Sequence, residues 1–137
     1  MKYLMMVKLD RGSEAAKSYE AGTAPPEKLM EAMTKLMGDL AAKGKLVDTA
    51  GLAPVAKGAK VRAAGGKLIV TDGPFIESKE VIGGFAVIQA NSKEEALKTG
   101  REFMQVHVDI LGPSYEGELE IREMSDPGEC SQSESKG

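Results

Sequence analysis

The spacing of hydrophobic residues changes between the period of a strand and that of a helix along the first half of the chain. Residues 2–9 are apolar on both alternating faces, which predicts a strand. Apolar residues then recur three and four positions apart between Pro26, suited to the first position of a helix, and Gly44, suited to end it. Residues 10–25 have no apolar period and read as a surface loop with room for one helical turn.

The next segment predicts a strand, a hairpin and a further strand. Residues 46–54 predict a strand that stops at Pro54. Two short apolar runs then flank Gly65 and Gly66, and this is a hairpin signal because both glycines tolerate positive φ. Residues 83–90 predict the strand that follows.

The last two elements are a helix and a strand. Ser92 and Glu95 have the Ser-x-x-Glu spacing of a capping box, which predicts the start of a second helix. Gly112 and Pro113 predict its end. Residues 118–124 alternate between polar and apolar side chains and predict a final strand.

This order of elements indicates an α+β protein, with a ferredoxin-like split βαβ topology and an inserted hairpin. The strands at residues 2–9 and 83–90 are then central, and both are apolar on two faces. Two helices cover only one face of the sheet, and monomers seldom expose a large apolar area. We therefore expect a homodimer that packs sheet to sheet through four residues: Leu4, Met6, Ala86 and Ile88.

Composition and charge narrow the class of protein. The 137 residues suit one domain, placed at residues 1–124, and the polar residues 125–137 predict a disordered tail. Acidic and basic residues are interleaved with a net charge of -3, which argues against nucleic acid as a partner. No apolar run approaches the ~20 residues that span a bilayer, and the N-terminus lacks the features of a signal peptide. We expect a cytoplasmic protein without a membrane partner.

The side chains that could bind a metal are few. Cys130 is the single cysteine, so an intramolecular disulfide and a cysteine-based zinc site are excluded. One histidine and scattered carboxylates lack the spacing of metal ligands, and no phosphate-binding glycine motif follows a strand. We expect no metal and no cofactor. The methionines of the first helix read as core residues.

Asp72 lies in the tetrapeptide Asp-Gly-Pro-Phe, directly after an apolar run. One interpretation is structural: the carboxylate accepts backbone hydrogen bonds, Gly73 relieves the crowding before Pro74, and the proline sets the bend. The other is functional, with Asp72 as a base or polar anchor at the rim of a cleft. Phe75 is too large and apolar for a simple turn residue, so we expect it to pack on the domain or wall that cleft.

Three further features allow a structural and a functional interpretation. His107 shares a helix face with apolar residues, so it is either a packed residue or a proton-transfer group, and in the second case Asp72 and His107 should approach one cavity. Arg62, on the hairpin, is either a solvated charge or the anchor of a ligand carboxylate or phosphate. Gly83 and Gly84 predict a β-bulge or a close backbone approach.

The stretch "VTDGPFIESKEVIGGFAVIQANSKEEAL" resembles the DGPF signature of the YCII-related domain proteins. "GLAPVAKGAKVR" before it and "FMQVHVDILGPSYEGELEIREM" after it extend the resemblance from Tyr3 to Met124. The resemblance implies a ferredoxin-like dimeric α+β barrel, with an activity that is largely unassigned in the family. Some members occur beside or fused to sigma factors of the extracytoplasmic-function type, which implies a link to signalling.

The chain departs from the family at one position of interest. The YCII branch is credited with a His–Asp pair whose histidine lies early in the first helix, and "PPEKLMEAM" has none here. Three functions stay open. The first is a dimeric enzyme, such as an isomerase or lyase, that uses Asp72 and His107 as an acid–base pair on an unknown small molecule near the DGPF loop. The second is a non-catalytic ligand-binding or regulatory dimer linked to a sigma-factor pathway, and the third is a structural module.

Overall fold

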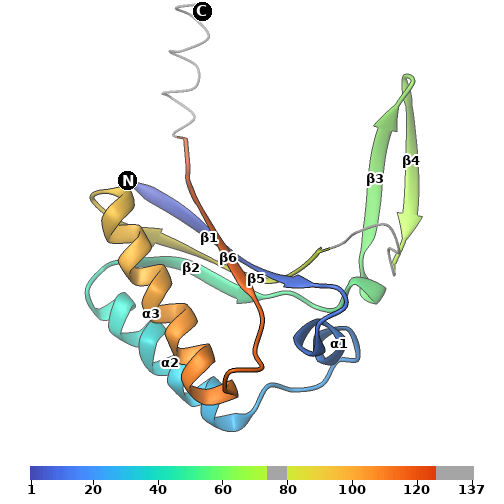
Figure 1. Ribbon diagram of the computed structural model, residues 1–137. Helices are drawn as coiled ribbons and strands as arrows, with labels where there is room; N and C mark the ends of the chain where they lie inside the picture. Colours follow the sequence, from blue (N-terminus) through green and yellow to red (C-terminus); the bar gives the residue numbers. More distant parts are fainter. Residues whose placement is uncertain (74–79, 126–137) are drawn as a thin grey trace, which may run out of the picture.

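The computed structural model describes residues 1–73 and 80–125. Two sheets and three α-helices make up this part of the chain (Figure 1). The elements follow in this order: β1 (Lys2–Asp10), α1 (Glu14–Glu20), α2 (Glu27–Ala42), β2 (Leu46–Gly51), the 3-10 turn η1 (Val55–Lys57), β3 (Ala59–Ala64), β4 (Lys67–Asp72), β5 (Glu80–Gln89), α3 (Lys93–Leu111) and β6 (Glu118–Glu123). None of the helices in these ranges is long and apolar enough to cross a membrane.

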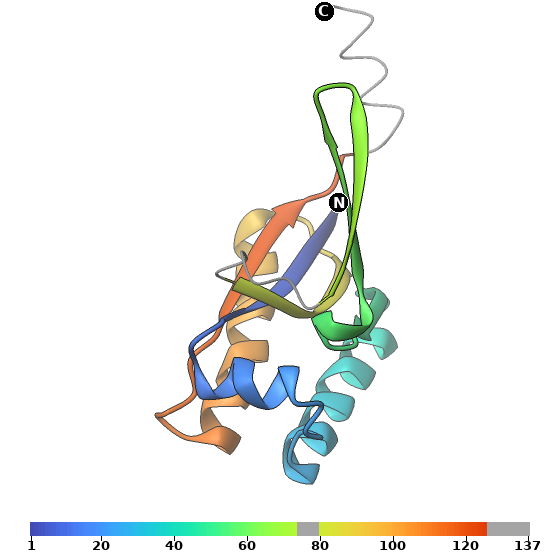
Figure 2. The ribbon, with the colours of Figure 1, turned by 90° about the vertical axis from the view of Figure 1, so that its right-hand side faces the viewer.

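The main sheet has four antiparallel strands in the order β2-β5-β1-β6. Helices α2 and α3 lie side by side on one of its faces (Figures 1 and 2). With the β3–β4 hairpin inserted between β2 and β5, this is the ferredoxin-like α+β arrangement that the order of elements predicts. The central position of β1 and β5 is confirmed.

The pairing of β1 with β5 decides which side chains face the helices. Met5 lies opposite Ala86 and Tyr3 lies opposite Ile88, and residues directly opposite in an antiparallel pair share a face. All four are buried, in one cluster with Ala96 of α3. The prediction that Ala86 and Ile88 belong to the uncovered face is therefore wrong. Both faces of β5 are apolar, so its own pattern does not show which face meets the helices.

The uncovered face of the sheet is formed by the alternate residues of the same strands. Met6 lies opposite Phe85, and Leu4 lies opposite Val87. These four side chains are partly exposed. We call this group the open face of the sheet, and Leu4 and Met6 belong to it as expected.

A β-bulge interrupts the pairing of β1 and β5 at the glycine pair. Val7 lies opposite Gly84 while the next residue, Lys8, lies opposite Ile82, so Gly83 is the extra residue. Gly84 also approaches β2 closely, because a Cβ atom at this position would lie 3.0 Å from the carbonyl oxygen of Ala50. The bulge and the close backbone approach that the sequence predicts at Gly83 and Gly84 are both present.

The ends of the two long helices follow the sequence signals closely. Pro26 is the N-cap of α2 rather than its first helical residue, and its carbonyl accepts from the N–H groups of Leu29 and Met30. Gly44 follows the end of α2 with a φ of 70°. At the start of α3, the N–H of Glu95 donates to Ser92 Oγ at 3.1 Å. The Glu95 carboxylate accepts from the N–H of Asn91, one residue before the N-cap.

Residues 14–20 form a helix, α1, where the sequence predicts a loop with at most one turn. Ser13 caps it, with Oγ accepting from the N–H of Ala16 at 3.1 Å. The apolar face is short, and its one fully buried side chain is the small Ala16. Two turns with such small residues give no detectable helical period, which is why the apolar pattern missed α1.

The β3–β4 hairpin turns at Gly65 and Gly66, whose φ angles of 58° and 75° fit the predicted turn with two positive values. At its base, the N–H of Gly73 donates to the carbonyl of Gly58 at 2.8 Å. A Cβ atom on Gly73 would lie 1.7 Å from the carbonyl oxygen of Val55. Glycine is therefore required in the DGPF sequence by close packing against η1. Apart from Ser125, the predicted tail at residues 125–137 lies outside the described residues.

Candidate functional site

A large cavity lies between the helices and the helix-facing side of the sheet. Its volume is about 960 Å³. Residues of β1, β5, α1, α2 and the C-terminal part of α3 line it, together with the segment that connects α1 to α2. Most of the wall is apolar, and typical apolar lining residues are these: Met5, Val7, Leu29, Met33, Met37 and Phe103. Met33 and Met37 thus line the cavity instead of filling the core.

The charged groups of the wall are few. Among the described residues that line the cavity, Glu14 is the only acidic one, and none is a lysine or an arginine. Hydroxyl groups are more frequent, with Tyr19, Thr49 and Tyr115 among them. The wall is therefore suited to a neutral ligand, because a buried anion without a cationic partner costs several kcal/mol.

His107 is the histidine of this wall, a residue type suited to proton transfer. Its Nδ1 lies 2.9 Å from the carbonyl oxygen of Phe103, one helical turn earlier. A carbonyl oxygen only accepts, so Nδ1 carries the proton and donates it. In the neutral ring, Nε2 is then an acceptor with a free lone pair.

Two aromatic rings hold the imidazole in place. The ring centroid of His107 is 4.9 Å from that of Phe103 and 5.3 Å from that of Tyr115, with interplanar angles of 32° and 31°. These distances lie within the range of favourable aromatic pairs. The backbone hydrogen bond and the two rings together fix both the tautomer and the orientation of the imidazole.

The two tyrosines of the wall are neutral hydrogen-bonding groups at physiological pH. Burial raises the pKa of Tyr115 above its ordinary value. Burial, and to a lesser extent the negative charge of Glu20, also raise the pKa of Tyr19. The Tyr19 hydroxyl lies 2.8 Å from the carbonyl oxygen of Leu52 and 2.7 Å from that of Ala53. One hydroxyl proton is shared between two carbonyls, and it ties α1 to the segment that follows β2.

The structure does not bring Asp72 and His107 to one cavity within the chain. Asp72 is exposed at the end of β4, opposite Ala59, and Arg62 is exposed on β3, opposite Ile69. Neither residue lines the cavity, which His107 does. The reason is that the hairpin carries both residues away from the helix-covered face of the sheet (Figure 1). Phe75, the other predicted ligand-binding residue, lies outside the described residues.

Tyr19 and Tyr115 are residues of the site that sequence reasoning missed, and Tyr19 is the more instructive of the two. It lies in the stretch interpreted as a loop, and its role depends on α1, which the apolar pattern did not reveal. The signal that was available is the pair Ser13 and Glu14, a helix N-cap followed by an acidic residue in the first turn. A helix there would have placed Tyr19 near its C-terminal end.

Comparison with known proteins places the chain in a family. The model of the YCII-related domain matches residues 1–107. One similar relative is the uncharacterized protein R00369 of Rhizobium meliloti (strain 1021). The two chains are 34% identical over 105 residues, which cover 75% of this chain and 80% of the relative.

Proposed function

The chain belongs to the YCII-related domain family, and we propose that it binds a small, neutral and mostly apolar molecule between its sheet and its helices. The observation that carries this proposal is the cavity of about 960 Å³ on the helix-covered side of the sheet. Pockets for small molecules have volumes of roughly 300–1,000 Å³ and combine apolar walls with a few polar groups. The cavity has both properties.

The composition of the wall supports the class of ligand. Methionine side chains are flexible and polarisable, so Met33 and Met37 can adapt to an aromatic or alicyclic ligand. The lack of lysine and arginine among the described lining residues disfavours carboxylates and phosphates. His107 Nε2 is the acceptor for one hydrogen-bond donor of the ligand, such as a hydroxyl group.

The same geometry supports acid–base chemistry as an extension of binding. A neutral imidazole with Nδ1–H bound to a carbonyl can take a proton at Nε2 from a bound molecule and return it later. The imidazolium that forms keeps its hydrogen bond to the Phe103 carbonyl, which stabilises the charge. In this proposal His107 acts as the acid–base residue without Asp72 of the same chain.

A set of three matched probes tests the binding proposal. 2-Naphthol is apolar and carries one donor, 2-methoxynaphthalene has the same rings without the donor, and 2-naphthoate carries a negative charge. We expect saturable binding in the order naphthol, methoxynaphthalene, naphthoate, measured by calorimetry. His107→Phe keeps an aromatic ring between Phe103 and Tyr115 but removes the acceptor. It should weaken naphthol binding by about 3- to 10-fold, the value of one hydrogen bond, and leave methoxynaphthalene binding unchanged.

Two results would overturn this function. Absence of saturable binding for all three probes would show that the cavity is not a site for this class of molecule. Binding that Met33→Trp leaves unchanged would show that the probes bind elsewhere, because the larger side chain fills part of the cavity. Val47→Thr, at an exposed position of β2, is the control for a change outside the cavity.

We also propose that two copies of the chain form a homodimer through the open face of the sheet. The support is the apolar character of Leu4, Met6, Phe85 and Val87, which neither α2 nor α3 covers. A second sheet packed at ~10 Å would remove these side chains from water. The dimer would be the α+β barrel that the family resemblance implies.

A further inference from the structure

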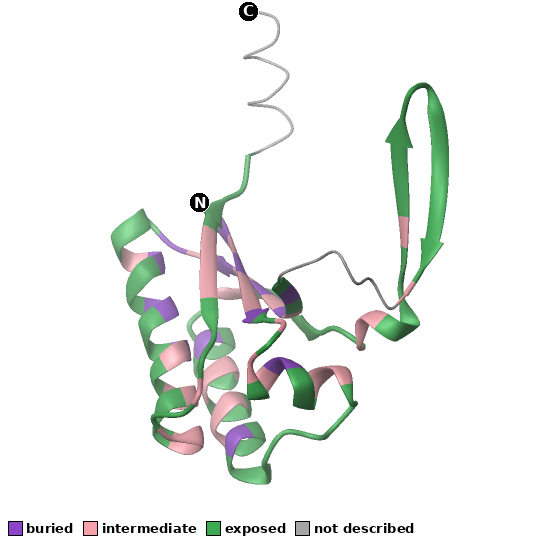
Figure 3. Ribbon diagram, turned by 45° about the vertical axis from the view of Figure 1, so that its right-hand side comes forward, coloured by how far each residue is buried: buried purple, intermediate pink, exposed green. Residues whose placement is uncertain are grey.

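The hairpin of β3 and β4 stands away from the main sheet and is exposed along most of its length (Figure 3). Val61 is 66% exposed, Leu68 73%, Ile69 52% and Val70 67%. A two-stranded hairpin is marginally stable at best in water unless it packs against other structure. A concentration of exposed apolar side chains usually marks an interaction surface.

Most of these side chains lie on one face of the hairpin. Val61 lies opposite Val70, and the next position along each strand, with Arg62 opposite Ile69, belongs to the other face. We call the first surface the hairpin face. It consists of five apolar residues and, at the base, one acidic residue: Ala59, Val61, Ala63, Leu68, Val70 and Asp72. Beyond Asp72 at the base the face is apolar, and a second surface packed on it would remove these side chains from water.

The two strands of the hairpin are closed against each other at the base. The N–H of Gly73 donates to Gly58 at 2.8 Å, and the backbone of Gly73 packs against that of Val55. The strands β3 and β4 are paired along their whole length, from Ala59 to Ala64 on β3. The hairpin therefore projects as a fully paired, two-stranded arm.

We propose that this arm holds a second copy of the chain, with the hairpin face of each copy packed on the body of the other. Figures 1 and 2 show the hairpin projecting on the side of the sheet that faces away from α2 and α3. That is the side of the open face. A second copy seated on the open face lies beside the hairpin, and two-fold symmetry then gives each arm the same contact. The inference rests on the homodimer proposed above.

The distribution of charge favours another copy of this chain as the partner of the hairpin. The hairpin from Ala59 to Asp72 carries three basic side chains and one acidic, a net charge of +2. The whole chain carries -3, so the remaining residues together carry -5. The three basic side chains, Lys60, Arg62 and Lys67, lie on the face opposite the hairpin face. They therefore attract the acidic body of a second copy at longer range, outside the apolar contact, and complementary charge promotes association. One acidic element of that body is the strand β6 at the edge of the sheet. It carries three glutamates and one arginine: Glu118, Glu120, Glu123 and Arg122.

Two neighbouring positions of β4 provide a matched test. Val70→Asp places a charge on the hairpin face, and Ile69→Asp places the same charge on the opposite face, where the exposed fraction is similar. We expect Val70→Asp to raise the dimer dissociation constant roughly 10- to 100-fold, since a charge replaces a valine that the proposed contact would bury. Ile69→Asp should change it by less than about threefold. Sedimentation velocity gives the constants, and circular dichroism checks the fold.

The possible results of this experiment distinguish the failure of the arm proposal from the failure of the homodimer proposal. A wild-type chain that stays monomeric at 100 µM, a concentration at which roughly millimolar affinity would already be detectable, overturns both. A dimer that Val87→Asp on the open face dissociates, and Val70→Asp does not, overturns only the arm. If a variant misfolds, hydrogen exchange on the wild-type protein still tests the arm proposal, because it needs no substitution. Protection of the β4 amides should rise with protein concentration, and protection that is independent of concentration contradicts the proposal.

Discussion

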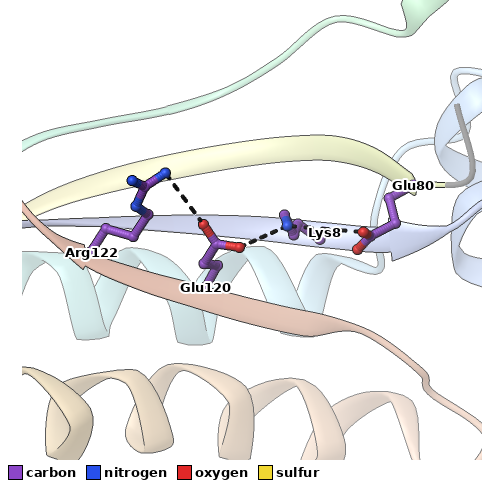
Figure 4. Close-up of polar contacts among 4 residues, drawn as sticks. All are labelled: Lys8, Glu80, Glu120 and Arg122. Atoms are coloured by element: carbon purple, nitrogen blue, oxygen red, sulfur yellow. Dashed lines mark hydrogen bonds and ion pairs between the residues drawn. The ribbon is translucent and has the colours of Figure 1, made fainter.

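Lys8 of β1 donates a hydrogen bond to Glu120 of the neighbouring strand β6, with Nζ 2.8 Å from Oε1 (Figure 4). Both side chains are partly shielded, with 20% and 33% of their surface exposed. Two weaker ion pairs extend the group, from Lys8 to Glu80 at 3.9 Å and from Glu120 to Arg122 at 4.0 Å. The cluster joins β5, β1 and β6 across the sheet.

This pair makes the stability of the protein depend on pH at both ends of the scale. The hydrogen bond and the charge of Lys8 lower the pKa of Glu120. The pair therefore stabilises the fold above the ordinary glutamate pKa of about 4.3, and the effect is lost as the pH falls through the lower pKa of the folded protein. The hydrogen bond to Glu120 raises the pKa of Lys8, so its contribution is present below about 10.4 and is lost as the pH rises through the higher value.

Glu120→Gln should consequently lower the urea midpoint most between roughly pH 6 and 9, and the gap to the wild type should narrow toward pH 3. Urea titrations at a series of pH values measure this difference. Glu116→Gln removes the same charge from the exposed loop between α3 and β6 and is the matched control. A gap that is the same at pH 3 and pH 7 would show that the carboxylate charge does not act through Lys8.

Gly73→Ala should destabilise the base of the hairpin. The new Cβ atom would lie 1.7 Å from the carbonyl oxygen of Val55, so the backbone must shift. We expect a loss of about 1–3 kcal/mol in the free energy of unfolding, the usual cost of overpacking. Gly38→Ala is the control, and we expect it to change the free energy of unfolding in the opposite direction. A Cβ at Gly38, inside α2, meets nothing within 4 Å, and alanine should stabilise the helix by about 0.5–1 kcal/mol. Equal effects of the two substitutions would contradict the close packing of Gly73.

Tyr19→Phe should loosen α1 from the end of β2. It removes the hydroxyl that donates to the carbonyls of Leu52 and Ala53, at a cost of about 0.5–1.5 kcal/mol. Lys17→Ala, at an exposed position of the same helix, should change stability by less than about 0.5 kcal/mol. Hydrogen exchange should show faster exchange in α1 for Tyr19→Phe alone. If the two variants exchange alike, the hydroxyl does not anchor the helix.

Local sequence signals predict most of the fold, because they act over a few residues. Gly65 and Gly66 fix the hairpin turn, Ser92 begins α3 and Gly44 follows the end of α2. The sequence analysis did not predict the helix α1, because the buried residue of this helix is a small alanine. The side of the sheet on which Ala86 lies was predicted wrongly for another reason. Both faces of β5 are apolar, and only the pairing with β1 decides which face meets the helices.

The candidate site was harder to predict than the fold. Periodicity shows that one face of α2 is apolar, but it does not show whether Met33 and Met37 fill the space or line a cavity. His107 was chosen as a candidate because its chemistry is visible in the residue itself, and it lines the cavity. Its placement apart from Asp72 depends on the direction of the hairpin, which no local pattern encodes.

The open face and the helix-covered face can be told apart by two adjacent residues of β5. Val87 lies opposite Leu4 on the open face, and Ile88 lies opposite Tyr3 in the core, with 1% of its surface exposed. Ile88→Asp buries a charge without a partner, and we expect it to prevent folding. Val87→Asp should leave the circular dichroism spectrum intact and convert the proposed dimer to a monomer, measured by sedimentation velocity. The reason is that its side chain is in contact with water in the single chain and is desolvated only by the second sheet. If Val87→Asp unfolds the chain as Ile88→Asp does, both faces belong to the core of one subunit. If it folds and remains dimeric, the two copies meet at another surface.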